Sequence, residues 1–391
     1  KTRDKMVFLS KECHVKAVII CFLSWINYVQ SFAASTSCGE QFSTRMDQDV
    51  FSKHRYRSRL IESKPISMPF ECYVNCMKNC QCASYNICND GKLCELNSEK
   101  KEDNASLYQQ SDECDHYEYE FSKKSPSAEC SDPCCSTSDT CLNGGHCQVT
   151  CMKNNKRFQC DCPDGYAGDR CEIKARSCAS YAKSLNKKNG LHVIYTSDGS
   201  KLSVFCHFTP EYAMTLVMSF SKQQCDIFQP YSLVEDFPRN EDAQNWYGYR
   251  LSLANMEGIR DDSSTHWIYT CSYQTRGLSE VDSLRSKFSE TDVLTYEFSP
   301  EERCTKKFEY VNVKSKSCED CSIPFGQSLH GILFVNGNDL SCGGFPSVNV
   351  PVCSNGKPAR YFGRCECFDT QFSCHTNPSS TTQLWFAHYL G

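Results

Sequence analysis

Cysteine is the residue type with the most evident chemistry in this sequence. The chain has 31 cysteines among 391 residues, a density typical of proteins that fold in an oxidising compartment, where thiols are converted to disulfides. We therefore interpret the cysteines as a framework of covalent crosslinks. The same cysteine density argues against a cytosolic enzyme. We expect these crosslinks, rather than a large apolar core, to hold the folded parts of the chain rigid.

The other reactive residues do not form an enzyme signature. A Gly-x-Ser-x-Gly pattern is absent, and five histidines lack serine or aspartate neighbours in the arrangement of a hydrolase: His146, His192, His207, His266 and His375. Cys365, Cys367 and the Cys374-His375 pair offer soft metal ligands, but bridging is favoured over zinc binding in an oxidising compartment. We expect no catalytic residues, no metal site and no cofactor.

Composition and charge exclude further classes. With 40% hydrophobic residues, 23% charged residues and a mean hydropathy of -0.52, the chain is expected to be soluble and folded. Its formal net charge of -5 at pH 7 argues against a nucleic-acid partner, because nucleic-acid binding requires a strongly basic face. The same charge is too small to indicate a polyanionic mineral nucleator.

The N-terminal region has the pattern of a secretory signal. Residues 1–5 precede the first methionine, Met6, and are interpreted as upstream sequence or a fragment edge. Basic residues, an apolar run over 17–29 and small residues at 31–34 then predict a signal peptide over 6–34. The apolar run is shorter than the roughly 20 residues of a membrane span. We expect a secreted mature chain without a membrane span.

The cysteines of the mature chain fall into three groups, which suggests three modules. Eight lie between Cys38 and Cys114, nine between Cys130 and Cys171, and twelve between Cys178 and Cys374. Candidate linkers run over 121–129 and 173–177. Because nine is odd, one thiol of the middle group must stay free, reach another module or cross to a second chain. The sequence therefore allows a disulfide-linked partner.

The first module, residues 35–120, combines a helix with strands. Three cysteines recur every fourth residue, at Cys72, Cys76 and Cys80, which places them on one face of a short helix. Alternating segments around 84–87 and 94–96 predict two strands joined by a turn at 89–91. With Cys82-x-Ser84-Tyr85 and Cys94-Glu95-Leu96-Asn97, this stretch resembles the PAN/apple family, whose modules bind proteins or carbohydrates.

The PAN/apple resemblance also implies disulfide pairs. The implied bridges are Cys38–Cys114, Cys72–Cys94 and Cys76–Cys82, with Cys80 and Cys88 as an additional pair that departs from the family.

Two features of this module are candidate interaction or modification sites. The basic segment 53–59 is a candidate for sulfated polysaccharide, or else a solvated strand with alternating charges. Asn104 opens an Asn-x-Ser sequon and is the expected glycosylation site of a secreted protein.

The second module, residues 130–172, contains Cys141-Leu-Asn-Gly-Gly-His-Cys147 and a closing loop with Gly-Tyr-x-Gly. Glycines permit tight turns in a hairpin too small for an apolar core. These motifs resemble the EGF-like family. The resemblance implies the pairs Cys141–Cys160 and Cys162–Cys171, and it pairs Cys147 with one of two neighbours, Cys134 or Cys135. The residues before the first cysteine lack the acidic pattern of calcium-binding members, so we expect no dedicated calcium site.

The third module, residues 177–391, begins with a predicted hairpin. Apolar alternation over 190–195 and 202–206 flanks an Asp198-Gly199 turn. The 28-residue spacing of Cys178 and Cys206 resembles the start of a fibrinogen-like domain, and this resemblance implies that the two cysteines pair. Departures include Thr209-Pro-Glu-Tyr212 in place of a Gly-Gly-Trp motif. Two aromatic segments, 245–250 and 265–269, are suited either to stacking on sugars or to packing in a core.

Together these features predict a modular, disulfide-rich and mostly β protein. The modules are a small α+β apple-like domain, an EGF-like hairpin and a divergent fibrinogen-like α+β region. Their order resembles secreted cnidarian proteins, including those of the coral skeletal organic matrix. This resemblance implies a non-enzymatic glycoprotein of the extracellular matrix or of adhesion, including the organic matrix of a biomineral, with proteins or glycans as partners. The alternative is a soluble lectin-like recognition or defence protein.

Overall fold

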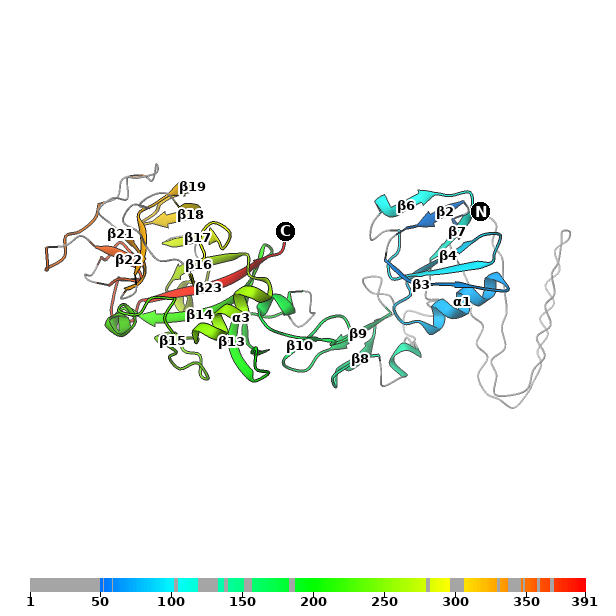
Figure 1. Cartoon of the computed structure of the whole chain (residues 1–391), viewed down its shortest axis with the longest axis horizontal. Coiled ribbons are helices and arrows are strands. Elements are labelled where there is room, and N and C mark those ends of the chain that lie inside the picture. The colour runs from blue at the N-terminus through cyan, green and yellow to red at the C-terminus, as the bar shows by residue number, and fades with distance from the viewer. Residues whose placement is uncertain are drawn as a thin grey trace. The chain divides into compact units, whose positions relative to one another are not determined.

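The computed structural model describes residues 50–51, 53–57, 59–101, 105–118, 133–136, 140–150, 157–182, 187–278, 282–295, 306–328, 331–336, 346, 349–356, 359–365 and 369–391. The chain divides into two compact units. Unit 1 comprises Lys1–Thr140 and Cys147–Gln159, and unit 2 comprises Cys141–His146 and Cys160–Gly391. Strands dominate both units (Figure 1). No helix in the described part of the chain is long and apolar enough to cross a membrane.

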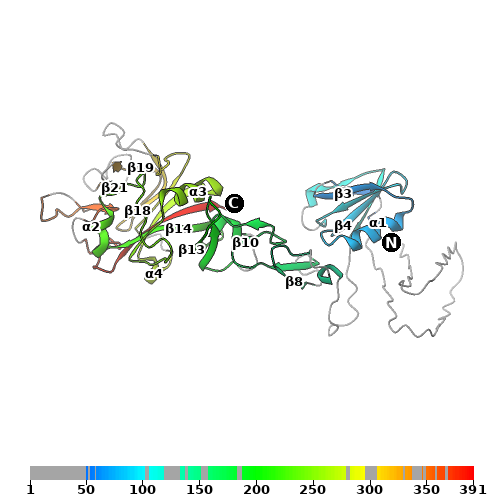
Figure 2. The same cartoon turned by 60° about the horizontal axis from the view of Figure 1, so that its bottom comes forward.

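Unit 1 is built on a five-stranded antiparallel sheet. Its strands lie in the order β1 (Val50–Phe51), β7 (Cys114–Glu118), β4 (Ser84–Cys88), β5 (Leu93–Asn97) and β3 (Leu60–Pro65). Helix α1 (Pro69–Lys78) packs on β4 and β5 (Figure 2). The helix and the hairpin predicted from the sequence are therefore confirmed.

The turn between β4 and β5 explains why this hairpin forms. Asn89 and Asp90 have φ of 53° and 54°, and Gly91 has φ of 80°. Asparagine, aspartate and glycine are the residues that enter this left-handed region at the lowest cost. The tight connection brings Cys88 opposite Leu93 in the ladder.

Helix α1 buries a cysteine-bearing face. Cys72 and Cys76 are fully buried, and Pro69 occupies the first turn, where its missing N–H costs no hydrogen bond. The helix ends at Lys78, so Cys80 lies beyond it and the predicted three-cysteine helical face holds only for the first two. Arg157, which is 3% exposed, donates hydrogen bonds to the carbonyl oxygens of Cys76, Met77 and Asn79, where the helix ends.

A second layer in unit 1 is polar. The short strands β2 (His54–Tyr56) and β6 (Tyr108–Gln110) pair with each other, and the turn η1 (Ala105–Leu107) precedes β6. The buried amide of Asn86 bonds the Tyr56 backbone in both directions, donates to Glu95 and lies 2.8 Å from the His116 ring nitrogen Nδ1. Arg55 donates hydrogen bonds to both carboxylate oxygens of Glu95. Because these buried polar atoms have partners, the layer avoids much of the desolvation cost of burial.

The stretch that follows contains only short elements. They are η2 (Pro133–Ser136), the paired strands β8 (His146–Val149) and β9 (Phe158–Asp161), and the paired strands β10 (Tyr166–Ala167) and β11 (Ile173–Lys174). These small hairpins are linked by cystines, as expected for a segment too short to bury a large apolar core.

Unit 2 contains a nine-stranded sheet with the C-terminal strand at its centre. The path runs through β12 (Gly190–Tyr195), β13 (Lys201–Phe208), β14 (Tyr212–Ser221), β23 (Thr381–Tyr389), β16 (His266–Cys271), β17 (Ser283–Lys287), β18 (Lys307–Val313) and β19 (Lys316–Ser322), while β15 (Gly248–Arg250) pairs with β14. Figure 1 shows β23, in red, between β14 and β16. The predicted first hairpin is confirmed, with Gly190 opposite Cys206.

Smaller elements complete unit 2. A three-stranded sheet is formed by β20 (Phe325–Ser328), β21 (Gly331–Asn336) and β22 (Arg360–Phe362). The helical segments are η4 (Cys178–Tyr181), η5 (Lys222–Gln224), α2 (Cys225–Phe228), α3 (Leu253–Ser263) and α4 (Tyr273–Arg276). Helix α3 begins at Ser252, whose hydroxyl accepts the N–H of Asn255 and so caps the helix.

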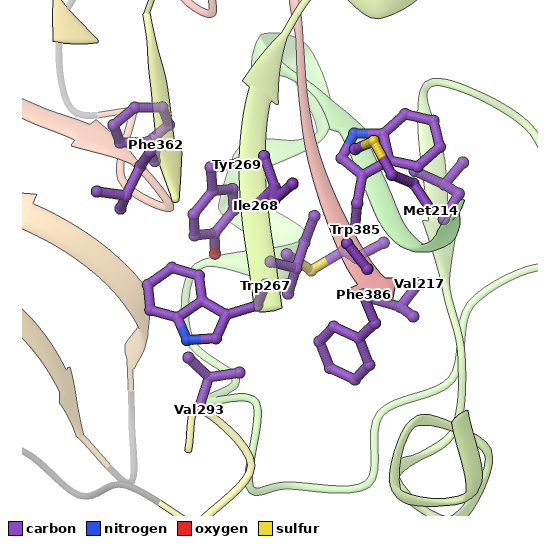
Figure 3. Close-up of a cluster of buried hydrophobic side chains, with 14 of the residues drawn as sticks. Met214, Val217, Trp267, Ile268, Tyr269, Val293, Phe362, Trp385 and Phe386 are labelled. Atoms are coloured by element: carbon purple, nitrogen blue, oxygen red, sulfur yellow. The ribbon is translucent and has the colours of Figure 1, made fainter. Parts of the chain in front are cut away.

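The core of unit 2 is large and apolar. Side chains alternate across β16, so that Trp267 and Tyr269 lie on one side and Ile268 on the other, next to residues of β14 and β23 (Figure 3). Trp267 and Trp385 are fully buried. The expectation that disulfides replace an apolar core is therefore wrong for unit 2, because a wide sheet buries long aromatic and aliphatic side chains by itself.

Candidate ligand-binding site

In unit 1, the cysteines closest to the helix pair as the family resemblance implies. Cys72 bonds to Cys94 and Cys76 to Cys82. The first bridge joins helix α1 to strand β5, and the second joins the helix to the connection between α1 and β4. The predicted partner Cys38 and the expected glycosylation site Asn104 lie outside the described residues.

Two predicted bridges of the first module are wrong. Cys114 pairs with Cys88, and Cys80 pairs with Cys134, so Cys38–Cys114 and Cys80–Cys88 do not form. Cys114 pairs with Cys88 because the two residues lie directly opposite each other on β7 and β4, with a Cα–Cα distance of 4.0 Å. The Cys80–Cys134 bridge arises because Cys80 lies beyond the helix and meets the following cysteine-rich stretch.

The second cysteine group pairs largely as the EGF-like resemblance implies. Cys141 bonds to Cys160 and Cys162 to Cys171, and Cys147 takes Cys135 from its two candidate partners. Cys134 instead forms the bridge to Cys80. Of the three options for an odd thiol, a bridge to another cysteine group is therefore the one that this structure contains. Cys130 and Cys151 lie outside the described residues.

In unit 2, some cystines are local and two connect segments more than 100 residues apart in sequence. Cys178 pairs with Cys206, as implied at the start of the fibrinogen-like stretch. Further bridges among the described residues are Cys225–Cys365, Cys271–Cys374 and Cys318–Cys321. Because Cys365 and Cys374 are oxidised, they supply no thiolate to a metal. No cluster of three metal-ligating side chains occurs within the described ranges.

Several basic residues of the segment 53–59 in unit 1 form ion pairs with carboxylates of the same unit. Arg55 is bonded to the buried Glu95, Lys53 lies 3.7 Å from Asp112, and Arg59 lies 3.1 Å from Glu99. Three of the cations are thus matched by carboxylates of the same unit, which favours the alternative of a solvated strand over a polysaccharide site.

The two aromatic segments of unit 2 serve mainly as core. Tyr249, Trp267 and Tyr269 are fully buried, whereas Tyr247 is 50% exposed. Trp246 is half-buried and packs against Phe205 at a ring distance of 5.0 Å. Core packing is therefore the better interpretation for the central residues of both segments.

A pocket of about 250 Å³ lies on one face of the large sheet. Strands β14, β16, β17 and β18 contribute lining residues, with β23 lying between β14 and β16 in the sheet, and the turn before β14 contributes Thr209, Pro210 and Glu211. Its lining combines apolar, aromatic, hydroxyl and charged side chains: Thr209, Pro210, Glu211, Tyr212, Met214, Ile268, Thr270, Leu278, Ser283, Arg285 and Tyr310. This mixture is typical of small-molecule sites, in which a few polar groups orient a ligand within an apolar wall.

The strand register explains how the pocket residues come together. Ile268 lies opposite Arg285, and Arg285 lies opposite Tyr310, so the three side chains share one face of adjacent strands. Met214 reaches the same face from β14. Four segments far apart in sequence thus contribute to a single site.

Arg285 is the cationic residue in the lining of this pocket, which also contains the acidic Glu211. Its Nε atom donates a 2.9 Å hydrogen bond to Oε2 of Glu309. Its guanidinium carbon lies 5.4 Å from the ring centre of Tyr212 and 5.8 Å from that of Tyr310. The two rings favour a cation at this position through their negative faces.

Glu309 also faces His266. The His266 Nε2 atom lies 3.2 Å from Glu309 Oε2 but is not aligned for a hydrogen bond. Burial lowers the pKa of His266, assisted by the charges of Arg285 and Lys287 and opposed by Glu309. At neutral pH, His266 is therefore uncharged, and Arg285 is the charged partner of the Glu309 carboxylate among the described residues.

A polar network lies beneath the pocket. Trp385 Nε1 donates a 2.8 Å hydrogen bond to Thr270 Oγ1, and this hydroxyl donates to Gln383. Burial raises the pKa of Tyr212, with the Arg285 charge as a smaller opposing influence. The Tyr212 phenol therefore stays neutral at physiological pH and available as a hydrogen-bond donor.

Sequence reasoning missed this pocket. The sequence marks Thr209-Pro210-Glu211-Tyr212 only as a departure from a family motif, and it does not point to Arg285 or Tyr310. The segment 283–287 contains a single apolar residue, Leu284, so it lacks the alternation that would have indicated a strand around Arg285. Its neighbours across the sheet cannot be read from the sequence.

Comparisons with known proteins give short matches. No family model matches the chain. A segment of 46 residues, 12% of the chain, is 46% identical to human Protein jagged-1. The corresponding proteins of Mus musculus and Rattus norvegicus are 44% identical over 46 residues. Each match spans 4% of the relative's length. These matches provide weak similarity to an EGF-like protein, and with the many cystines they indicate a disulfide-rich protein of extracellular type.

Proposed function

We propose that this chain is a non-enzymatic protein of the extracellular matrix or of cell adhesion, which binds proteins or glycans through its modules. The observation that carries the proposal is the pocket on the sheet of unit 2, which presents stacking surface and hydrogen-bonding groups on a rigid scaffold. The cystine framework suits such a role, because it stabilises small modules outside the cell.

The modules are proposed to be a PAN/apple-like domain, an EGF-like domain and a divergent fibrinogen-like domain. The cystines Cys141–Cys160 and Cys162–Cys171 support the second. The cystine Cys178–Cys206 supports the third. The order of modules extends the proposal to the organic matrix of a biomineral, and Asn104 to a glycoprotein.

The proposal is tested by binding of the secreted, oxidised full chain to decellularised extracellular matrix and to a glycan array. We expect retention on at least one of these surfaces after washing at physiological salt. Failure to bind matrix protein, matrix glycan and arrayed glycan alike would refute the proposal.

The second candidate function is a soluble lectin-like recognition protein. The position of the pocket within the C-terminal module favours it, because a single module then carries the ligand site. Microbial glycan binding that a free monosaccharide abolishes, together with no retention on matrix, would select this candidate. Recovery from an insoluble matrix after harsh cleaning would select the first.

A further inference from the structure

The pocket on the unit 2 sheet contains a guanidinium edge that the general binding proposal does not use. Arginine has five N–H donors in a planar arrangement. The Nε–H group of Arg285 donates a hydrogen bond to Glu309. Within the described ranges, its two Nη atoms make no hydrogen bond, and the side chain is 30% exposed. Its remaining donors are therefore open to a ligand.

The surroundings hold Arg285 in place without consuming these donors. Tyr212 and Tyr310 face the guanidinium with their rings, and aromatic contacts use the planar face rather than the N–H edge. Glu309 fixes the Nε side. An arginine restrained in this manner loses little side-chain entropy when it binds a ligand.

The open Nη edge of Arg285, rather than a net positive charge of the pocket, favours a carboxylate ligand, because Glu309 already pairs with the guanidinium. The Glu309 carboxylate forms an ion pair with Arg285 and lies beside the uncharged His266. A carboxylate bound to the Nη edge would complete the second side of the guanidinium in a bidentate arrangement, the geometry in which arginine binds carboxylates most strongly. Glu211 at the rim is exposed, so solvent and salt screen its repulsion.

The remaining walls suit a ring with one apolar face. Leu278 is 40% exposed and Tyr310 is half-buried, and both line the pocket together with Pro210. A volume of about 250 Å³ is below the roughly 300–1,000 Å³ of pockets that take drug-sized ligands. The space therefore suits a single small ring with polar substituents.

We propose that this pocket binds an acidic sugar residue, a uronic or sialic acid. Its carboxylate would lie on the Nη edge of Arg285, and the C–H face of its ring would lie against Tyr310 and Leu278. The inference rests on the proposed binding function and specifies the ligand class of the same site.

The test is titration of the oxidised full chain with four probes, followed by calorimetry or ligand-observed NMR: glucuronic acid, N-acetylneuraminic acid, glucuronic acid methyl ester and glucose. We expect one or both acids to bind at least about tenfold more tightly than the ester and glucose, because the ester has the same ring without the charge. Glucose 6-sulfate distinguishes a general anion site from a carboxylate site. Binding of the sulfate ester as tight as that of the acids would overturn the carboxylate assignment.

Variants test the role of Arg285. Arg285→Lys keeps the charge but removes the bidentate edge, and we expect at least a fivefold loss of affinity for the acid. Arg239→Lys is the matched control, since Arg239 also lies over an aromatic ring, Phe237, at 3.8 Å but does not line the pocket. Leu278→Ala provides a second variant in which Arg285 is intact, and it should weaken binding of the acid as well. An unchanged thermal midpoint shows that each variant is folded.

Other outcomes separate this inference from the proposed function. Equal affinity for glucose and glucuronic acid, or an acid affinity unchanged by both pocket variants, would overturn the ligand class while leaving matrix or glycan binding in place. Tighter binding of a peptide with a free C-terminal carboxylate than of either acidic sugar would overturn it in favour of a peptide ligand. Loss of all matrix and glycan binding would refute the proposed function itself.

Discussion

The two units are stabilised in different ways. Among the described residues of unit 1, the apolar cluster beneath helix α1 has seven buried members, and four are cysteines: Ile66, Cys72, Cys76, Cys82, Tyr85, Cys94 and Leu96. The cluster of unit 2 is far larger and consists mostly of aromatic and aliphatic side chains. Cystines thus replace an apolar core where the module is small, and they supplement one where the sheet is wide.

The second faces of the sheets differ as well. In unit 1, Asn86, Glu95 and His116 form a buried polar layer under Tyr56. In unit 2, one face of the sheet carries Phe205, Trp385 and the candidate pocket. A polar layer satisfies its own hydrogen bonds, whereas the pocket of unit 2 has partly exposed residues, Leu278 and Tyr310, available for a ligand.

The largest effect is expected from the core of unit 2. Trp267→Ala removes a fully buried ring that stacks on Phe325 and meets Phe308 edge to face. We expect a loss of about 3–5 kcal/mol in the free energy of unfolding of unit 2, measured by urea unfolding with the fluorescence of Trp246 and Trp385. Tyr247→Ala, at a half-exposed ring, is the control and should cost less than about 1 kcal/mol. An effect of Trp267→Ala below that of the control would contradict the dominance of this core.

A pair of cystines of similar span sharpens the comparison. Cys72–Cys94 and Cys178–Cys206 close segments with sequence separations of 22 and 28, so each should contribute about 3 kcal/mol through chain entropy. Replacing both cysteines of the first bridge by alanine is expected to unfold unit 1 at 37 °C. The same change at the second bridge should lower the midpoint of unit 2 without unfolding it. Circular dichroism and limited proteolysis would report both outcomes, and equal sensitivity of the units would refute the distinction.

Acid should act on unit 2 through a buried histidine. His375 is 1% exposed, and its two ring nitrogens have no hydrogen-bond partner within the described residues. Burial, with Lys222 as a smaller cause, lowers the pKa of His375 to about 3. The unfolded chain, with a histidine pKa near 6.5, binds the proton first, so stability falls as pH drops from about 6.5 toward 3.

We expect this group to cost roughly 2 kcal/mol at pH 5 relative to pH 7. His375→Leu should remove that share of the acid dependence and leave stability at pH 7 unchanged or higher, because no hydrogen bond is lost. Part of the acid dependence should persist, since burial also lowers the pKa of His207 and of His266. An unaltered pH dependence of the unfolding midpoint in the variant would rule out His375 as the acid-sensitive group.

The smallest effect is expected at the end of helix α1. Arg157→Lys removes the planar group that binds three carbonyl oxygens there, and we expect unit 1 to lose about 1–2 kcal/mol. Arg176→Lys, at an exposed arginine, should change stability by less than about 0.5 kcal/mol. Hydrogen exchange of the α1 amides measures both variants, and identical exchange in the two would show that Arg157 does not stabilise the helix.

Local features were predictable from the sequence, whereas contacts between distant segments were not. The helix with Cys72 and Cys76 and the hairpin around Asp198-Gly199 follow from spacing and turn chemistry. The Cys88–Cys114 and Cys80–Cys134 bridges depend on which strands pair and where the helix ends. Both are decided by tertiary packing rather than by local preference.

The same reasoning applies to the pocket. Tyr212, Arg285 and Tyr310 lie on three strands, and they meet only because β23 enters between β14 and β16 from the C-terminal end of the chain. Sequence separation conceals such a site, because no residue in it has an unusual neighbour along the chain. The aromatic segments that were visible in the sequence turned out to serve mainly as core.

The most direct test of this account is hydrogen exchange of the full chain before and after complete reduction under otherwise native conditions, with full reduction verified by alkylation and mass. We predict that reduction exposes the amides of β4 and β5 to fast exchange while β16 and β23 keep most of their protection. Retained protection of β4 and β5 after reduction, or loss of protection in β16 and β23 together with them, would contradict the account.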